Sequence, residues 1–186
     1  MNRRYWFPKR YADQVARLRV PFGFVLVAAF GWFSAPDARS LAWGLPLAAV
    51  GLLLRGWAAG HLAKNTRLAM SGPYSYVRNP LYVGTALVAA GLALATRQWG
   101  LAALFAAVFG LIYLPAIELE EQHLRKLFPE YAEYAQRVPL LVPRPGARVR
   151  SEGAFSWRLY WKNEEYQALA GFLAGAALLA WKVWRF

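Results

Sequence analysis

The sequence has no cysteine and few charged residues of either sign. Its 186 residues include 22 Lys or Arg, 10 Asp or Glu and two His, so the charged fraction is 17%. Without cysteine, the chain has no disulfide, no thiolate metal site and no cysteine nucleophile. We expect no metal among the site ligands, and we look for the function of the protein in the few charged residues that it has.

Hydrophobic residues make up 58% of the chain, and they are gathered into long runs. Such runs are typical of an integral membrane protein. The net charge of +12 has two interpretations. Nucleic-acid binding requires a basic face on a soluble domain. Here the Arg residues flank apolar runs, which is where membrane proteins place Arg to contact anionic lipid headgroups. We expect membrane lipids as partners and no nucleic acid.

The apolar runs predict an all-α integral membrane protein with about five transmembrane helices. The runs cover residues 20–33, 41–60, 80–95, 99–117 and 168–181. Pro80 suits the first turn of the third helix, and Pro115 is expected to bend the end of the fourth. A cytoplasmic helical segment that binds the cofactor is expected to follow the fourth span. We divide the chain into an interfacial segment (1–19), a membrane core (20–145), and a linker with an extra helix (146–186).

The distribution of basic residues predicts the orientation in the membrane. Residues 1–19 are basic and aromatic and contain no signal-peptide cleavage site, so we expect them to lie on the cytoplasmic surface. The positive-inside rule places the 61–79 loop and the segment after residue 117 on the same side. The last helix then places the C-terminus outside, which Lys182 and Arg185 weakly oppose. A composition rich in Arg, Ala and Gly hints at a bacterial inner membrane protein.

Two charged patches bracket the hairpin formed by the third and fourth spans. The first is the 71–84 segment, punctuated by Gly and Pro; the second contains Glu120 and Glu121. Glu120 shares a helical face with Leu124 and Leu127, where it either pairs with a neighbouring cation or serves a function. Two adjacent Glu on the side of a basic loop favour a function. Pro129 predicts a break and a second short helix, followed by an extended 137–145 segment.

Two pairs of glycines have the spacing that lets membrane helices approach closely. They are Gly56 with Gly60, and Gly171 with Gly175. The alternative is chance in a chain with 15 glycines. We expect helix packing at both pairs, and a possible homo-oligomer through the second.

Together these motifs resemble the isoprenylcysteine carboxyl methyltransferase and phospholipid methyltransferase superfamily of integral membrane enzymes. The resemblance covers roughly residues 54–143. Its ordered elements are Gly72-Pro73-Tyr74, Arg78-Asn79-Pro80-Leu81-Tyr82-Val83-Gly84, Glu120-Glu121, Leu124, Phe128, Tyr131, Tyr134 and Arg137-Val138-Pro139. Asn79 stands where the family has His, so that position has a donor and an acceptor but no acid or base near neutral pH. Pro129 stands where the family has Gly, and a proline is also compatible with a helix break at this position.

The resemblance implies S-adenosylmethionine as cofactor and S-adenosylhomocysteine as product. Glu120 and Glu121 would hold the ammonium and the ribose hydroxyls of S-adenosylmethionine, and Arg78 would hold its carboxylate. Arg137 is the predicted catalytic residue, orienting the acceptor beside the methyl group; its alternative is a headgroup anchor. The predicted cofactor-binding residues are Arg78, Asn79, Pro80, Tyr82, Gly84, Glu120, Glu121, Leu124, Tyr131 and Tyr134.

Two other functions compete with methyl transfer. Membrane sterol reductases that use NADPH share a similar C-terminal pattern, but Leu81 and Thr85 replace their usual Asn and Asp. A non-catalytic scaffold would have no need for Glu120 at the bilayer surface. The sequence therefore favours a methyltransferase whose acceptor is lipid-like or a small apolar molecule, and it leaves that acceptor unnamed.

Overall fold

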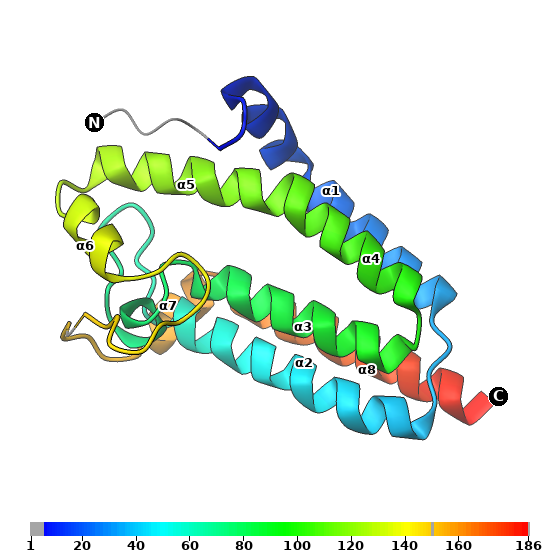
Figure 1. Ribbon diagram of the computed structural model, residues 1–186. Coiled ribbons are helices and arrows are strands. Elements are labelled where there is room, and N and C mark those ends of the chain that lie inside the picture. The colour runs from blue at the N-terminus through cyan, green and yellow to red at the C-terminus, as the bar shows by residue number, and fades with distance from the viewer. Residues whose placement is uncertain (1–5, 150, 186) are drawn as a thin grey trace.

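The computed structural model describes residues 6–149 and 151–185, without the side chain of Arg19. Helices and connecting loops make up all of this described part, so the predicted all-α fold is confirmed (Figure 1). A 3₁₀ turn covers Gly72–Ser75, and a π-helical turn, η2, covers Phe109–Tyr113. The α-helices are α1 (Lys9–Phe33), α2 (Ala38–Ala59), α3 (Pro80–Thr96), α4 (Trp99–Val108), α5 (Leu114–Leu127), α6 (Tyr131–Arg137), α7 (Trp157–Lys162) and α8 (Glu165–Arg185).

The helices have the length and composition of membrane spans. Three described helical stretches qualify alone, residues 38–59, 99–127 and 165–185, and a fourth qualifies if the two halves of α1 count together. Helix α3 is apolar but shorter, with 17 residues, the lower limit for crossing a bilayer. The chain is thus an all-α integral membrane protein whose apolar helices match the predicted set of about five.

The fourth predicted span does not stop near residue 117. It continues without interruption through α4, η2 and α5 to Leu127. Pro115 has no amide hydrogen to offer the carbonyl of Leu111, and the helix widens into a π turn just before it. The freed Leu111 carbonyl accepts a hydrogen bond from the Tyr11 hydroxyl at 2.7 Å. At the position of the expected bend, the structure has a local change of helix type.

Helix α1 starts earlier than the predicted span and consists of two parts. Its segments 9–18 and 20–33 meet at 52°, where Pro21 removes a helical hydrogen bond. The buried carboxylate of Glu118 on α5 accepts hydrogen bonds from the backbone amides of Trp6 and Phe7, at 2.5 and 3.1 Å. The residues just before α1 are thereby attached to α5. The division into segments 1–19, 20–145 and 146–186 stays a prediction.

Helices α2 and α3 pack against each other through two glycines on each helix. A Cβ atom on Gly44 would lie 2.5 Å from the carbonyl oxygen of Gly91, and one on Gly51 would lie 2.6 Å from that of Gly84. Each helix therefore repeats glycine at a seven-residue interval, so that the backbones touch. In this seam Gly84 is a packing residue, and its predicted contact with the cofactor stays a prediction.

The two glycine pairs chosen from sequence have different surroundings in the described part of the chain. Gly56 lies against the ring of Tyr160 on α7, so α2 and α7 meet there, and Gly60 lies against the ring of Phe155, just before α7. A Cβ atom added to Gly171 or Gly175 would meet no heavy atom of the described residues within 4 Å. Self-association through that face of α8 stays a prediction.

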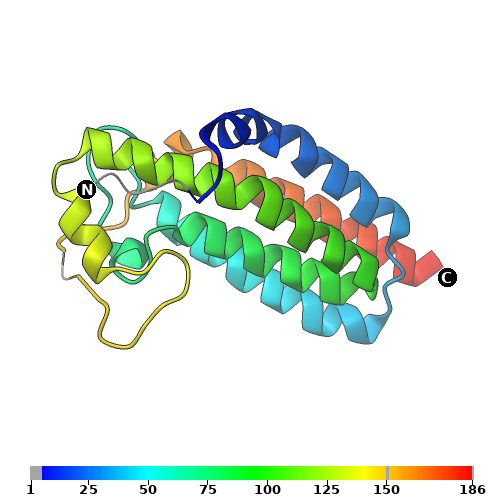
Figure 2. The same ribbon diagram turned by 45° about the horizontal axis from the view of Figure 1, so that its top comes forward.

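The last helix packs against the bundle along its length. It lies beside α2 and α1 (Figure 2). At its far end the ammonium of Lys182 donates to the carbonyl of Ser34, at 2.9 Å, in the turn between α1 and α2. Helices α6 and α7 and the 60–79 and 138–156 loops gather at the opposite end of the bundle (Figure 1). The motifs that carry the resemblance meet at that end.

Candidate functional site

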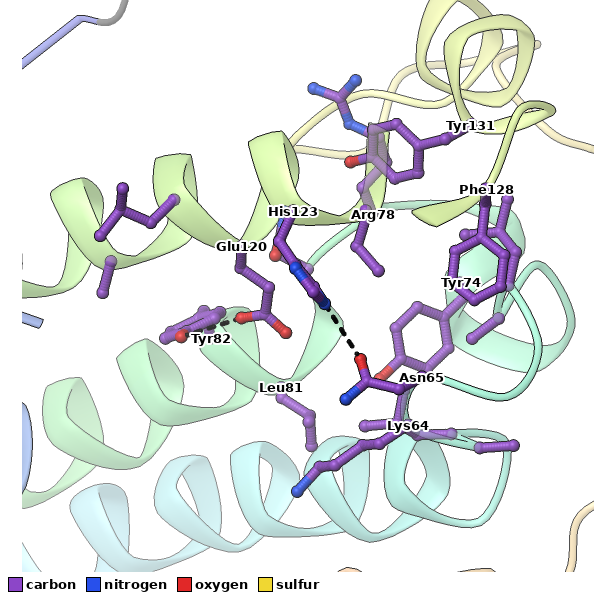
Figure 3. A pocket seen from close by; sticks show the side chains of 18 of the residues that line it. Lys64, Asn65, Tyr74, Arg78, Leu81, Tyr82, Glu120, His123, Phe128 and Tyr131 are labelled. Atoms are coloured by element: carbon purple, nitrogen blue, oxygen red, sulfur yellow. Dashed lines mark hydrogen bonds between the residues drawn. The ribbon is translucent and has the colours of Figure 1, made fainter. Parts of the chain in front are cut away.

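A cavity of about 540 Å³ opens at this end, between α5, the 62–69 loop and the first turn of α3 (Figure 3). Its size lies in the range of small-molecule and cofactor sites. The cavity brings together seven of the eleven residues predicted from sequence, and these are Arg78, Asn79, Tyr82, Glu120, Leu124, Tyr131 and Tyr134.

Glu120 is the only carboxylate among the described residues that line the cavity. It projects from α5 into the space, and the hydroxyl of Tyr82 on α3 donates to it at 3.2 Å (Figure 3). Only part of its hydrogen-bonding capacity is used by this contact, because a carboxylate accepts several bonds. Glu120 is therefore placed to bind a cationic group of a ligand.

Glu121 lies in a buried network and not at the cavity surface. Its buried carboxylate accepts a hydrogen bond from the Tyr131 hydroxyl at 2.6 Å, and the Asn79 amide donates to it at 3.4 Å. The Nε atom of Arg78 lies 3.1 Å away without aiming its hydrogen at the oxygen, so that contact is a charge pair only. Glu121 does not line the cavity. Its side chain lies behind the residues that do, where it links α5 to the segment before α3.

The Arg-Asn-Pro segment is held by the Val-Pro segment that follows α6. The backbone amides of Arg78 and Asn79 donate to the carbonyls of Pro139 and Leu140, at 2.9 and 3.2 Å. Asn79 is the N-cap of α3, and the buried Pro80 follows at the first helical position. These contacts give a physical reason for the two motifs to occur in one sequence, because the second supplies backbone acceptors to the first.

Four aromatic rings form the end of the cavity nearest α6. They belong to Tyr74, Phe128, Tyr131 and Tyr134. The Tyr134 hydroxyl donates to the Tyr74 carbonyl at 2.7 Å, and the rings of Tyr131 and Tyr134 meet edge to face at 5.9 Å. Burial, helped by the charge of Glu120 at Tyr74 and of Glu121 at Tyr131, raises the pKa of these phenols, and burial also raises the pKa of Tyr134. They are neutral rings suited to contact a flat, apolar group.

Basic residues surround the rest of the cavity. Arg17 from α1 and Lys64 and Arg67 from the 62–69 loop line it, and none forms an ion pair with any described residue. Across the opening, an imidazole nitrogen of His123 lies 3.3 Å from the side-chain oxygen of Asn65 (Figure 3). These cations suit an anionic group such as a carboxylate or phosphate.

Several cavity residues were missed as site residues from the sequence. His123 lies one turn after Glu120 on α5, and that helical spacing was available as a signal. Asn65 and Arg17 carried no such signal, because loop conformation and the bend of α1 bring them to the site. Asn65 adopts a left-handed backbone conformation with a φ of 58°, which Asn tolerates better than most residues.

Four predicted site residues lie outside the cavity lining. Pro80, Gly84 and Glu121 serve helix initiation, helix packing and the buried network described above. Arg137 lies at the end of α6, where its exposed guanidinium pairs with Glu133 at 2.6 Å. Arg137 does not line the cavity, and its catalytic role stays a prediction.

The position of Arg137 leads to a specific expectation for its Ala variant. Arg137 does not line the cavity, and its exposed ion pair contributes only about 0–1 kcal/mol to stability. Arg137→Ala should therefore leave both the fold and the affinity for S-adenosylhomocysteine, the product that the resemblance implies, nearly unchanged. Isothermal titration of the variant and the wild type measures that affinity, and the rate of methyl transfer is measured on the same samples. A lower rate at equal affinity would support the catalytic role; an unchanged rate would exclude it.

Comparison with known proteins agrees with the resemblance drawn from the motifs. Residues 42–131 match the phospholipid methyltransferase family. The chain is 27% identical over 141 residues to the protein-S-isoprenylcysteine O-methyltransferase of Schizosaccharomyces pombe, covering 73% of this chain and 59% of that protein. The recognition of this superfamily is therefore confirmed, and these matches support a membrane methyltransferase.

Two bacterial relatives are more similar in sequence. The cobalt-zinc-cadmium resistance protein CzcN of Cupriavidus metallidurans is 43% identical over 103 residues, which are 54% of this chain and 46% of the relative. The nickel-cobalt-cadmium resistance protein NccN of Alcaligenes xylosoxydans xylosoxydans is 38% identical over 126 residues, 67% of this chain and 57% of the relative. The chain spans about half the length of the curated relatives it matches. No solved structure matches it.

Proposed function

Because residues 42–131 carry the sequence pattern of the phospholipid methyltransferase family, we propose that this integral membrane protein transfers a methyl group from S-adenosylmethionine to a lipid-like or small apolar acceptor. The observation that carries the proposal is a cavity that combines the carboxylate of Glu120, several basic side chains and a cluster of aromatic rings. A methyl donor with an ammonium, a carboxylate and an adenine requires those three kinds of group.

The cavity residues suggest how the donor is held. Glu120 binds the ammonium, Lys64 and Arg67 bind the carboxylate, and the rings of Tyr74, Phe128 and Tyr131 contact the adenine. Bound there, S-adenosylmethionine supplies an electrophilic methyl group on a positively charged sulfur. The contribution of the protein is then mainly placement of the two reactants, since a direct displacement depends on alignment more than on an acid or a base.

The acceptor is proposed to approach from the membrane side of the same cavity. That side is lined by small and apolar residues of α1 and α5, among them Ala16, Ala116 and Leu119. An acceptor with an apolar tail can lie along these helices while its polar group reaches Glu120 and Tyr82.

The basic end of the bundle is proposed to face the cytoplasm of a bacterial inner membrane. The 61–79 loop and the 125–158 segment carry many cations and meet at that end (Figure 1). The opposite turns carry Arg39 and Arg97, and the positive-inside rule follows the larger cluster. The donor then reaches the cavity from the cytoplasm.

A ligand-stabilisation experiment tests the proposed donor. S-Adenosylmethionine and S-adenosylhomocysteine should raise the melting temperature of the detergent-solubilised protein, since a ligand at a hundred times its dissociation constant adds about 2.7 kcal/mol. NADPH and the chlorides of cobalt, zinc and cadmium serve as the comparison ligands. Stabilisation by NADPH alone would favour a sterol-reductase-like enzyme, and stabilisation by the metal salts alone would favour a metal-binding role.

A further inference from the structure

A partly buried charged junction lies where α2, α3 and α8 meet. Arg55 of α2 and Glu165, the first residue of α8, form a two-pronged ion pair, with Nε–Oε1 at 2.5 Å and Nη2–Oε2 at 3.0 Å. Glu165 is 5% exposed. Ionisable groups at such a position in a membrane protein are costly unless they have a function. Glu165 lies beyond residues 42–131, the region that matches the family.

The remaining donor group of Arg55 reaches the first turns of α3. Its Nη1 atom donates to the Thr85 hydroxyl at 2.5 Å and lies 3.5 Å from the Leu81 carbonyl. The absence of a side chain at Gly84 makes this reach possible, because a Cβ atom there would lie 2.5 Å from Cγ of Arg55. One guanidinium therefore binds α8 with two of its nitrogens and α3 with the third.

This part of α3 is a wall of the candidate site. Leu81 and Tyr82 both line the cavity, and the Tyr82 hydroxyl donates to Glu120. A continuous series of contacts thus runs from Glu165 through Arg55 and the Leu81–Thr85 turn to Tyr82 and Glu120. The start of α8 is connected to the one carboxylate among the described lining residues.

A second contact from the same segment supports the opposite wall. The side-chain amide of Asn163 donates to the carbonyls of Ala59 and Leu62, at 2.9 and 2.8 Å. These carbonyls end α2 and begin the 62–69 loop, where Leu62, Ala63 and Lys64 line the cavity. Residues before and at the start of α8 therefore contact both segments that face α5 across the cavity.

We propose that Arg55, Glu165 and Asn163 are positioning residues, through which the C-terminal helix sets the geometry of the donor site. The inference rests on the proposed function. Apolar residues of similar volume would join three helices equally well, since burying two charges costs most of what their attraction returns. A guanidinium with partners on both sides has directional bonds, which fix the rotation of α3 and with it the position of Tyr82.

The first test compares two ways of releasing α8. Glu165→Gln removes its charge at the junction, and Lys182→Met removes its anchor to the Ser34 turn at the far end. We expect the dissociation constant for S-adenosylhomocysteine, measured by calorimetry, to rise about tenfold in Glu165→Gln, a size seen for coupling through packed networks, and to stay near the wild-type value in Lys182→Met. Glu165→Asp, which retains the charge, should recover part of the loss.

A second variant covers the case in which Glu165→Gln does not fold. Arg55→Met combined with Glu165→Leu removes both charges together, and such replacements are often neutral or stabilising. The double variant should be folded, yet bind S-adenosylhomocysteine more weakly, because the donors to Leu81 and Thr85 are gone. Wild-type affinity in this folded double variant would overturn the inference.

A readout without ligand separates this inference from the proposed function. The chain lacks cysteine, so spin labels attached at Thr66→Cys and Lys126→Cys report the distance between the 62–69 loop and α5. We expect Glu165→Gln and Asn163→Ala to broaden this distance distribution, and Lys182→Met to leave it unchanged. Equal distributions in all variants would overturn the positioning role. Broadening in a protein that binds no S-adenosylhomocysteine would overturn the proposed donor while the positioning of the wall stands.

Discussion

Glu120→Gln is expected to weaken the binding of S-adenosylmethionine without unfolding the protein. The side chain projects into the cavity and its one described protein partner is the Tyr82 hydroxyl, so little of the fold depends on its charge. Loss of a charged hydrogen bond to the donor's ammonium should cost about 1.5–3 kcal/mol. Calorimetric titration of the variant against the wild type, together with its melting temperature without ligand, provides the measurement.

Two matched variants make this result specific. Glu133→Gln removes an exposed carboxylate of α6 that pairs with Arg137, and it should bind the donor as the wild type does. Glu121→Gln alters the buried carboxylate that accepts hydrogen bonds from Tyr131 and Asn79. It should lower the melting temperature without ligand, and any loss of donor affinity should follow from that loss of stability. The same affinity in Glu120→Gln as in Glu133→Gln would remove Glu120 from the donor site.

Gly91→Ala is expected to destabilise the protein strongly. The added methyl group would fall against the backbone amide of Ala48 and lie 2.6 Å from the carbonyl oxygen of Gly44. Backbone atoms cannot move aside as a side chain does, so α2 and α3 must separate. Overpacking of this kind costs about 1–3 kcal/mol or more, and it opposes the gain of about 1 kcal/mol that Ala normally brings to a helix.

Gly100→Ala is the control for this substitution. Gly100 is also helical, in the first turn of α4, and a Cβ atom there meets no described heavy atom within 4 Å. We expect Gly100→Ala to be neutral or stabilising in thermal unfolding in detergent, and Gly91→Ala to melt at a lower temperature. Equal melting temperatures would show that the seam between α2 and α3 can relax at little cost.

The motifs predicted the location of the site better than the roles of individual residues. Glu120 and Glu121 are adjacent in sequence, and both were expected to bind the donor. Successive residues on a helix point about 100° apart, so one faces the cavity and the other faces Tyr131 and Arg78. The spacing of a motif does not say which of two neighbours is turned toward a cavity, because that depends on the rotation of the helix against its neighbours.

The glycines illustrate the same difference between pattern and packing. The four-residue spacing of Gly171 and Gly175 favoured a helix contact, yet within the described residues nothing lies against them. The actual seam uses glycines seven residues apart on two helices, Gly44 and Gly51 opposite Gly91 and Gly84. A contact of this kind needs matching positions on both helices, and one helix read alone does not reveal its partner.

By itself, the sequence determined that this is an all-helical membrane protein with the motifs of the phospholipid methyltransferase family. Both conclusions depend on local properties, namely the length of apolar runs and the order of short motifs. Only the tertiary structure decided that Glu120 faces the cavity, that Gly84 belongs to a helix seam, and that Glu165 meets Arg55 across 110 residues of chain. Such contacts arise from how the helices rotate and pack together, which is a property of the whole bundle and of no single segment.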